Sequence, residues 1–217
     1  MIDQTAIVTD SISENEIISR ILLGEKNLYA GIMRKYNQRL YRVGMSIIKD
    51  ESEVEDVMQV TYIKAYENLG KFQFKSGFST WITKILINES LLRLKKRKQL
   101  LHINDDSAQN QIQHQPVDFQ TPLMKVINSE LKQILEDAIL NLPEKYRAVF
   151  IMREIENMNV SETQECLDLS ETNVKVRLNR AKAMLKNSLA DYYKKEDILN
   201  FHLSRCDRIV ENVMKRI

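Results

Sequence analysis

The sequence predicts an all-α protein made of two helical domains joined by a flexible linker, with a helix-turn-helix in the second domain. Five glycines and three prolines in 217 residues are too few turn residues for a β-sandwich or barrel, where a strand ends about every ten residues. In several segments apolar residues recur at three- and four-residue steps, the period of amphipathic helices. Over residues 99–121 this period is lost and Gln, Asn, Asp and Ser dominate, as in linkers that bury nothing.

Composition limits the possible functions. With 43% hydrophobic and 29% charged residues and a formal net charge of +2, the chain has the material for one or two small water-soluble domains. Its glycines are isolated, which excludes the phosphate cradles of P-loops and dinucleotide folds. The three histidines and two cysteines lack the spacing of a zinc site. We therefore expect no catalytic residue, cofactor or metal. Because no leader pattern or apolar span of about 20 residues is present, we expect a cytoplasmic protein without membrane insertion.

The first domain is expected to span residues 25–98 and to begin with two helices. Ser52 is positioned to cap the second helix, because acidic residues that suit a positive helix terminus follow it. That helix should run to Leu69 and end at Gly70. The first helix is predicted over residues 28–47 by a stripe of apolar residues, which are Leu28, Ile32, Tyr36, Leu40, Val43 and Ile47.

An aromatic and basic segment follows at residues 71–78, with the sequence Lys-Phe-Gln-Phe-Lys-Ser-Gly-Phe. It has no helical period and is expected to form a loop. Ser79 or Thr80 is positioned to cap the next helix, which begins at Trp81. This helix ends in a dense positive block at residues 93–98, Arg-Leu-Lys-Lys-Arg-Lys, which is the main basic feature of the chain.

The second domain is expected to span residues 122–190. Pro122 and Pro143 stand where helices begin, since the missing N–H of proline costs nothing there. Ser-Glu-Thr-Gln at residues 161–164 matches a capping box and predicts a short helix that stops near Leu167. A turn at residues 168–170 then leads into a helix with one apolar face and several polar and basic residues. A short helix, a tight turn and a helix of this kind make a helix-turn-helix candidate.

In order and spacing, these segments resemble the extracytoplasmic-function (ECF) sigma factors of bacterial RNA polymerase, which are of the sigma-70 type. The resemblance covers roughly residues 25 to 190, and residues 173–182 are its most specific stretch. It implies that the first domain corresponds to sigma region 2 and the second to region 4. The matching motifs are Glu55-Asp56-Val57-Met58-Gln59, the aromatic loop, Thr80-Trp81, Leu142-Pro143-Glu144-Lys145-Tyr146-Arg147 and the helix-turn-helix.

The resemblance implies a transcription initiation factor that binds core RNA polymerase through its clamp coiled coil and flap, directs it to specific promoters and assists promoter opening. Glu55, Asp56 and Gln59 match the surface that docks on the clamp. For Glu55 and Asp56 a plainer role is equally open, namely stabilisation of the helix N-terminus by about 0.3–1 kcal/mol. Where the family often has an acid after this glutamine, the chain has Val60.

Promoter opening requires a surface that holds an unstacked base, and aromatic rings beside cations bind single strands with about 1–3 kcal/mol per stacked base. By resemblance, the aromatic loop recognises the −10 element. Phe72, Phe78 and Trp81 are expected in the core. The loop residues expected to capture DNA are Lys71, Gln73, Phe74, Lys75 and Ser76. On the next helix, one polar face toward DNA is expected to consist of Lys84, Asn88 and Arg93, and the basic block favours nucleic acid in the same way.

A recognition helix places its N-terminal residues in the major groove and its flanks on phosphate. Glu171 can accept a hydrogen bond from cytosine, or it can simply stabilise the first helical turn. The residues expected to read base edges of the −35 element are Glu171, Thr172, Asn173, Lys175 and Arg177, and Arg180 and Lys182 are expected on phosphate.

Three segments lie outside the two domains. Residues 1–24 form an N-terminal extension with a short amphipathic helix. By resemblance, the linker would thread through polymerase channels as a nucleic-acid mimic, using Asp105, Asp106 and Asp118. Residues 191–217, with His202 and Cys206, form a C-terminal amphipathic helical extension that should pack on the second domain or on a regulatory partner. The family also implies an anti-sigma factor as a partner.

An alternative function is that of a free-standing helix-turn-helix repressor or activator, which does not bind polymerase as a sigma subunit. Such a regulator would be a dimer on a palindromic site and would bind duplex DNA unaided. Two weakly basic domains on a flexible linker should instead bind promoters poorly without the core enzyme.

Overall fold

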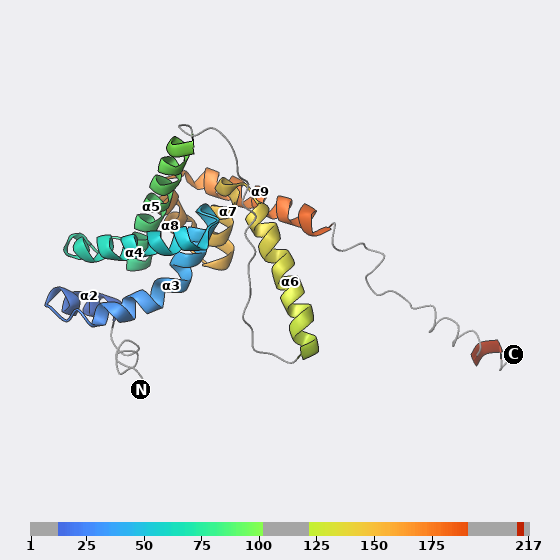
Figure 1. Ribbon diagram of the computed structural model, residues 1–217, viewed down its shortest axis with the longest axis horizontal. Coiled ribbons are helices and arrows are strands. Elements are labelled where there is room, and N and C mark those ends of the chain that lie inside the picture. The colour runs from blue at the N-terminus through green and yellow to red at the C-terminus, as the bar shows by residue number, and fades with distance from the viewer. Residues whose placement is uncertain (1–12, 102–121, 191–211, 215–217) are drawn as a thin grey trace.

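The computed structural model describes residues 13–101, 122–190 and 212–214. Every regular element in this part is helical, which confirms the all-α prediction (Figure 1). The predictions for the acidic linker residues and for His202 and Cys206 lie outside the described residues.

In chain order the elements are α2 (Glu14–Leu22), α3 (Leu28–Ile47), α4 (Glu51–Glu67), the 3₁₀ turn η1 (Leu69–Lys71), α5 (Phe78–Leu101), α6 (Pro122–Asn141), α7 (Glu144–Phe150), the π-helical turn η2 (Ile151–Ile155), α8 (Val160–Leu167) and α9 (Glu171–Ala190).

The short helix α2 packs on α3, although its residues lie ahead of the predicted first domain. Ile17, Ile18 and Ile21 are buried in the same core as α3. The Glu14 carboxylate accepts hydrogen bonds from the Lys35 ammonium at 2.7 Å and from the Tyr36 hydroxyl at 2.5 Å. The apolar stripe of α2 therefore finds its partner within the chain itself.

Helices α3 and α4 approach closely at Gly44. A Cβ atom at this position would lie 2.8 Å from Cγ1 of the buried Val54. The cap of α4 is Asp50, whose backbone is extended and whose carboxylate accepts from the Glu53 N–H at 2.9 Å. The prediction that Ser52 caps this helix is wrong, because the chain already turns into the helix at Glu51 and leaves Ser52 exposed in the first turn.

We expect Gly44→Ala to destabilise the first domain by about 1–2 kcal/mol, because forcing a methyl group into a packed interface costs about 1–3 kcal/mol and the better helix propensity of alanine offsets less than 1 kcal/mol. The midpoint of urea unfolding, followed by circular dichroism, measures the loss. The matched control is Gly70→Ala, where the nearest atom to the new Cβ is 3.9 Å away. A Gly44→Ala protein as stable as this control would contradict the close approach.

Helix α5 begins at Phe78, three residues earlier than predicted. The Gly77 carbonyl accepts from the N–H groups of Thr80 and Trp81 at 3.0 and 3.1 Å. Ser79 and Thr80 therefore lie inside the helix, and the prediction that one of them caps it is wrong. The physical reason is burial: Phe78 is 1% exposed and packs against Phe72 and Trp81.

The helix-turn-helix comprises α8 and α9. Asn159, not Ser161, forms the capping box with Glu162. This prediction was two residues late, because the buried Met158 turns the chain before Asn159. Asp168 ends α8 in the left-handed conformation, with φ 51°, and the Ser170 hydroxyl then accepts from the Asn173 N–H at the start of α9.

In the described part of the chain, the helices of the first domain, α2 to α5, contact those of the second, α6 to α9. Helix α7 packs on α3, and α8 packs on α5, as Figure 1 shows. The buried residues of α2 to α5 and of α6 to α9 form one continuous core cluster.

Candidate polymerase and nucleic-acid interfaces

The outer face of α4 carries the residues predicted to bind polymerase. Glu55, Asp56 and Gln59 are all exposed. Helical spacing places Asp56 and Gln59 on one face with Val60 and Ile63, which are 40% and 59% exposed. Ile63 was missed by sequence reasoning, although an apolar residue one turn beyond Gln59 was a usable signal. This face is therefore mixed polar and apolar.

The aromatic loop is built around the buried ring of Phe72. Its ring centre lies 4.7 Å from that of Phe74, 5.6 Å from Phe78 and 5.2 Å from Trp81. Phe72 and Phe78 are buried and Trp81 is half-buried, which confirms that these three rings belong to the core. The cluster anchors a loop whose tip is polar and exposed.

Phe74 is the ring of this cluster that faces solvent. It is 47% exposed and its φ of 55° is uncommon for a bulky residue. Strained backbone of this kind costs on the order of 1–3 kcal/mol and concentrates at functional sites. Packing against Phe72 therefore holds the Phe74 ring at the exposed surface of the loop.

The other predicted capture residues surround this ring with polar groups. Gln73 and Lys75 are exposed. The Lys71 ammonium donates to the side-chain oxygen of Asn68 at 2.9 Å. Ser76 is half-buried, because its hydroxyl donates to the Glu165 carboxylate of α8 at 3.2 Å.

The prediction that Lys84, Asn88 and Arg93 share one face of α5 is wrong. Nine residues of α-helix make about two and a half turns, so Lys84 and Arg93 point to opposite sides. The Arg93 guanidinium lies 3.4 Å from the Asp56 carboxylate of α4. Lys84 lies on the side toward α8, where its charge acts on the Cys166 thiol, and Asn88 is exposed. The basic side chains at residues 95–98 are all exposed.

The recognition-helix candidate α9 presents its N-terminal residues to solvent. Glu171, Thr172, Asn173 and Lys175 are exposed. The Lys175 ammonium lies 2.5 Å from the Glu171 carboxylate, and this hydrogen bond lowers the pKa of Glu171. The ion pair therefore favours the carboxylate form of Glu171.

Later residues of α9 are partly held by their own domain. Arg177 is half-buried beside the core face of α9. The Arg180 guanidinium donates to the Tyr146 hydroxyl at 3.4 Å and lowers the pKa of that hydroxyl. The Lys182 ammonium lies 2.9 Å from the Glu154 carboxylate. Sequence reasoning missed Val176, which is 40% exposed and is an apolar residue of the type that contacts a thymine methyl.

Within the described ranges, no helix has the length and apolar character needed to cross a membrane.

Comparison with known proteins gives matches in both domains. The family model for Sigma-70 region 2 matches residues 32–99, and that for Sigma-70, region 4 matches residues 132–185. The ECF RNA polymerase sigma factor SigW of Bacillus subtilis is 29% identical over 178 residues, which cover 80% of this chain and 95% of SigW. The ECF RNA polymerase sigma-E factor of Haemophilus influenzae is 25% identical over 189 residues, which cover 84% of this chain and 98% of that protein.

Solved structures share the fold. The sigma factor RpoE, in complex with the anti-sigma factor NepR from Bartonella quintana, superposes with a TM-score of 0.63 at 19% identity, over 74% of this chain and 96% of RpoE. CnrH, in complex with the cytosolic domain of CnrY, superposes with a TM-score of 0.55 at 19% identity, over 83% of this chain and 99% of CnrH.

The match to region 2 covers a domain that a free-standing helix-turn-helix regulator would not need. The two family models together match more than half of the chain, in the predicted order. The alignments with the two relatives named above, both sigma factors, cover nearly the whole length of each relative. The chain therefore belongs to the ECF sigma factors, the sigma-70-type transcription initiation factors that bind core RNA polymerase and direct it to promoters.

Proposed function

We propose that this sigma factor divides promoter recognition between its two domains. Residues 25–98 bind core polymerase and capture the opened −10 strand, and residues 122–190 read the −35 element. The observation that carries the proposal is the exposed Phe74 ring, which is fixed on a buried aromatic cluster in one domain, together with α9 in the other domain, whose first turn is capped by Ser170. One domain thus suits single-stranded DNA and the other suits duplex DNA.

On the first domain, the −10 strand is captured at the tip of the aromatic loop. A flipped base stacks on Phe74, and the polar groups around the ring bind its edges and phosphates. Arg93 reaches DNA only after it releases Asp56, which lies 3.4 Å away. The loop residues assigned to this role are Lys71, Gln73, Phe74, Lys75 and Ser76. On α5, Asn88 is exposed and extends this surface, whereas Lys84 and Arg93 lie on opposite sides of the helix and meet different parts of the DNA.

The clamp of core polymerase docks on the outer face of α4. Glu55, Asp56 and Gln59 supply the polar contacts. The exposed Val60 and Ile63 supply an apolar contact, and Val60 stands where the family often has an acid. Loss of water from such an apolar pair adds affinity of about 25 cal/mol per Å² buried.

On the second domain, α9 enters the major groove. The base-edge residues are Glu171, Thr172, Asn173, Lys175 and Arg177, and Arg180 and Lys182 bind phosphate. Of these, Thr172 and Lys175 are the best placed, since both are exposed near the N-terminus of the helix.

The protein acts by binding and has no catalytic chemistry of its own. It works in the cytoplasm, where bacterial core polymerase and DNA are found. The sigma factor RpoE, which shares this fold, was solved in complex with the anti-sigma factor NepR, and this supports an anti-sigma factor as a further partner of this chain.

Lys175→Ala tests the division of work. We expect the variant holoenzyme to lose about fivefold to 100-fold in promoter affinity, because a base contact is worth about 1–3 kcal/mol, while its affinity for core polymerase stays unchanged. Fluorescence anisotropy with labelled promoter DNA, and separately with labelled core enzyme, measures the two affinities. Lys186→Ala is the matched control, since Lys186 is an exposed lysine of the same helix, three turns further on.

The reciprocal variant is Gln59→Lys on α4. It should weaken binding of core polymerase and leave the fold intact, because Gln59 is exposed. Equal loss of both affinities in the Lys175→Ala and Gln59→Lys variants would contradict the division.

A further inference from the structure

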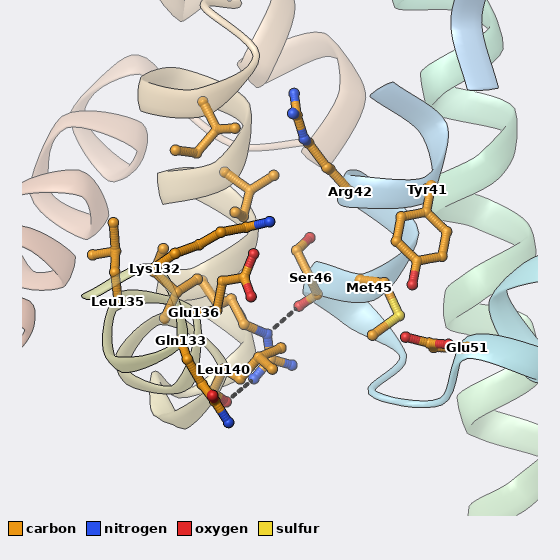
Figure 2. Close-up of a pocket in the computed structure, with 14 residues that line it drawn as sticks. Tyr41, Arg42, Met45, Ser46, Glu51, Lys132, Gln133, Leu135, Glu136 and Leu140 are labelled. Carbon is orange, nitrogen blue, oxygen red and sulfur yellow. Dashed lines mark hydrogen bonds between the residues drawn. The ribbon is translucent and has the colours of Figure 1, made fainter. Parts of the chain in front are cut away.

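A groove with an apolar floor lies between α3 and α6. It encloses about 420 Å³. Met45 of α3 and Ile139 of α6 line it and are each 8% exposed, so they form its floor. Figure 2 shows its rims, with Arg42 of α3 on one side and Lys132 and Glu136 of α6 on the other. An apolar floor between polar rims is typical of grooves that bind an amphipathic helix.

Polar contacts hold the two walls of the groove in place. The Arg42 guanidinium of α3 lies 3.0 Å from the carboxylate of Glu156, whose side chain is 8% exposed. Arg147 of α7 also lines the groove, and its Nε donates to the Ser46 carbonyl of α3 at 2.6 Å. The groove is therefore preformed, and a helix that binds there does not have to reorganise its walls.

The apolar surface continues beyond the groove along α6. Ala138 and Leu142 are buried, and two turns earlier on the same face Leu131 and Leu135 are 46% and 40% exposed. In Figure 1 this half of α6 extends away from the other helices of the core. Exposed apolar side chains that continue a buried stripe indicate an interaction surface.

The C-terminal extension, residues 191–217, has a sequence pattern that suits such a surface. From Leu199 onward, apolar residues recur at alternating steps of four and three, which is typical of a helix that packs lengthwise on another helix. Residues 212–214, which the structure describes, are helical, and Val213 is 50% exposed. We call this apolar row the seam, and its residues are Leu199, Leu203, Cys206, Val210, Val213 and Ile217.

The extension begins close to α6 and has the length to cover it. Helix α9 packs on α6, and Leu189 in its last turn still contacts the core. Residues 191–198 precede the seam and can span about 26–29 Å when extended, which is enough to turn back onto α6. A helix over residues 199–217 would be about 28 Å long, and α6, with 20 residues, is about 30 Å long.

We propose that the C-terminal extension folds back as a helix and docks with its seam on Leu131 and Leu135 of α6, along the open side of the groove. Docking removes apolar surface of both elements from water, which is the driving force. The short tether keeps the seam at an effective concentration on the order of millimolar near α6, so it occupies the groove in preference to a second copy of the chain. The inference concerns the free chain and does not depend on the proposed promoter contacts.

Crosslinking of Cys206 measures the docking. The chain has two cysteines, and the other one, Cys166, is buried with a thiol pKa raised by burial to about 12, so Cys206 is the reactive one. A second reactive thiol is introduced on the rim of the groove by Lys132→Cys, and the full chain is treated with a short bismaleimide. We expect an intramolecular link between positions 132 and 206, identified by mass spectrometry and by its faster migration on a denaturing gel.

The matched control for this link is Lys186→Cys. Lys186 is an exposed lysine of α9 that does not line the groove but is much nearer to Cys206 in the chain. A freely moving extension would therefore reach position 186 at least as readily as position 132. We expect the link to position 132 to form about tenfold faster, because docking raises the effective concentration of Cys206 at the rim.

Two substitutions in the extension test whether the seam itself docks. Val213→Glu places a carboxylate in the seam, and Asn212→Glu makes the same charge change one residue earlier, outside the seam. Both side chains are exposed, so neither variant should disturb the fold. Val213→Glu should slow the link between positions 132 and 206 by about tenfold, because burial of a charge in an apolar interface is unfavourable. Asn212→Glu should link at the parent rate.

Equal rates of linking at positions 132 and 186 would overturn the proposal, as would a rate at position 132 that Val213→Glu leaves unchanged. Dimers linked through Cys206 in place of the intramolecular link, with a yield that rises with protein concentration, would assign the groove to a second copy of the chain and would also overturn it.

Discussion

Phe74→Ala is expected to reduce the yield of open promoter complexes by about fivefold to 100-fold, because stacking of one base on an aromatic ring contributes about 1–3 kcal/mol. The ring is 47% exposed and packs on Phe72 with centres 4.7 Å apart. Removal of the ring leaves the buried part of the cluster in place. Permanganate footprinting of single-stranded thymines on a promoter measures the open complex, and gel-shift analysis on ice measures the closed one, which should change little.

Two controls identify the ring as the cause. Phe74→Tyr keeps a stacking surface and should retain most of the opening activity. Phe74→Gly relieves the strain of a positive φ but removes the ring, so it should open promoters as poorly as the alanine variant. Open-complex yields that follow backbone strain instead of the ring would remove Phe74 from the capture surface.

Arg147→Met is expected to destabilise the second domain by about 3–5 kcal/mol, because each hydrogen bond from a charged donor contributes about 1.5–3 kcal/mol and the easier burial of methionine offsets part of the loss. The guanidinium donates to the carbonyls of Ser46, Leu140 and Leu142 at 2.6, 2.8 and 2.9 Å. Methionine fills similar space but donates nothing, so three carbonyls lose their donor. Burial lowers the pKa of Arg147, yet an arginine stays charged at neutral pH.

Guanidinium unfolding with two probes measures this effect. Circular dichroism reports helices of both domains, whereas the single tryptophan, Trp81, reports the aromatic cluster at the start of α5. The Arg147→Met protein should lose helical signal at a lower denaturant concentration than it loses the native fluorescence of Trp81. Lys145→Met is the control, since Lys145 is exposed on the same helix. Coincident, wild-type transitions in Arg147→Met would show that the three hydrogen bonds contribute little.

Local patterns predicted helices well and helix caps poorly. The apolar period placed α3 at residues 28–47, where the structure has it. The caps were misplaced at Ser52, Thr80 and Ser161, since several polar residues near each helix start are chemically suitable. Burial of a neighbouring apolar side chain, such as Phe78 or Met158, decides which residue takes the cap, and a local pattern does not contain that information.

The candidate sites were predicted in the same uneven way. Exposure of Glu55, Gln59 and Lys175 followed from amphipathic spacing. Arg93 was placed on the wrong face of α5. The nine residues between Lys84 and Arg93 make about two and a half helical turns, and that half turn was not taken into account. The apolar Ile63 and Val176 were passed over, since an apolar residue on an exposed face looks like a core residue until the core is known.

By itself, the sequence determined the all-α fold, the order of the two domains and the family to which the chain belongs, because helical period, turn residues and motif order are all properties of nearby residues. Only the tertiary structure decided that Glu156 meets Arg39 and Arg42, that Arg147 reaches Ser46, and that α8 covers the start of α5. These partners stand about 90 to 120 positions apart. Their pairing depends on how two packed domains meet, and residue type alone does not specify which distant charge fills a given buried site.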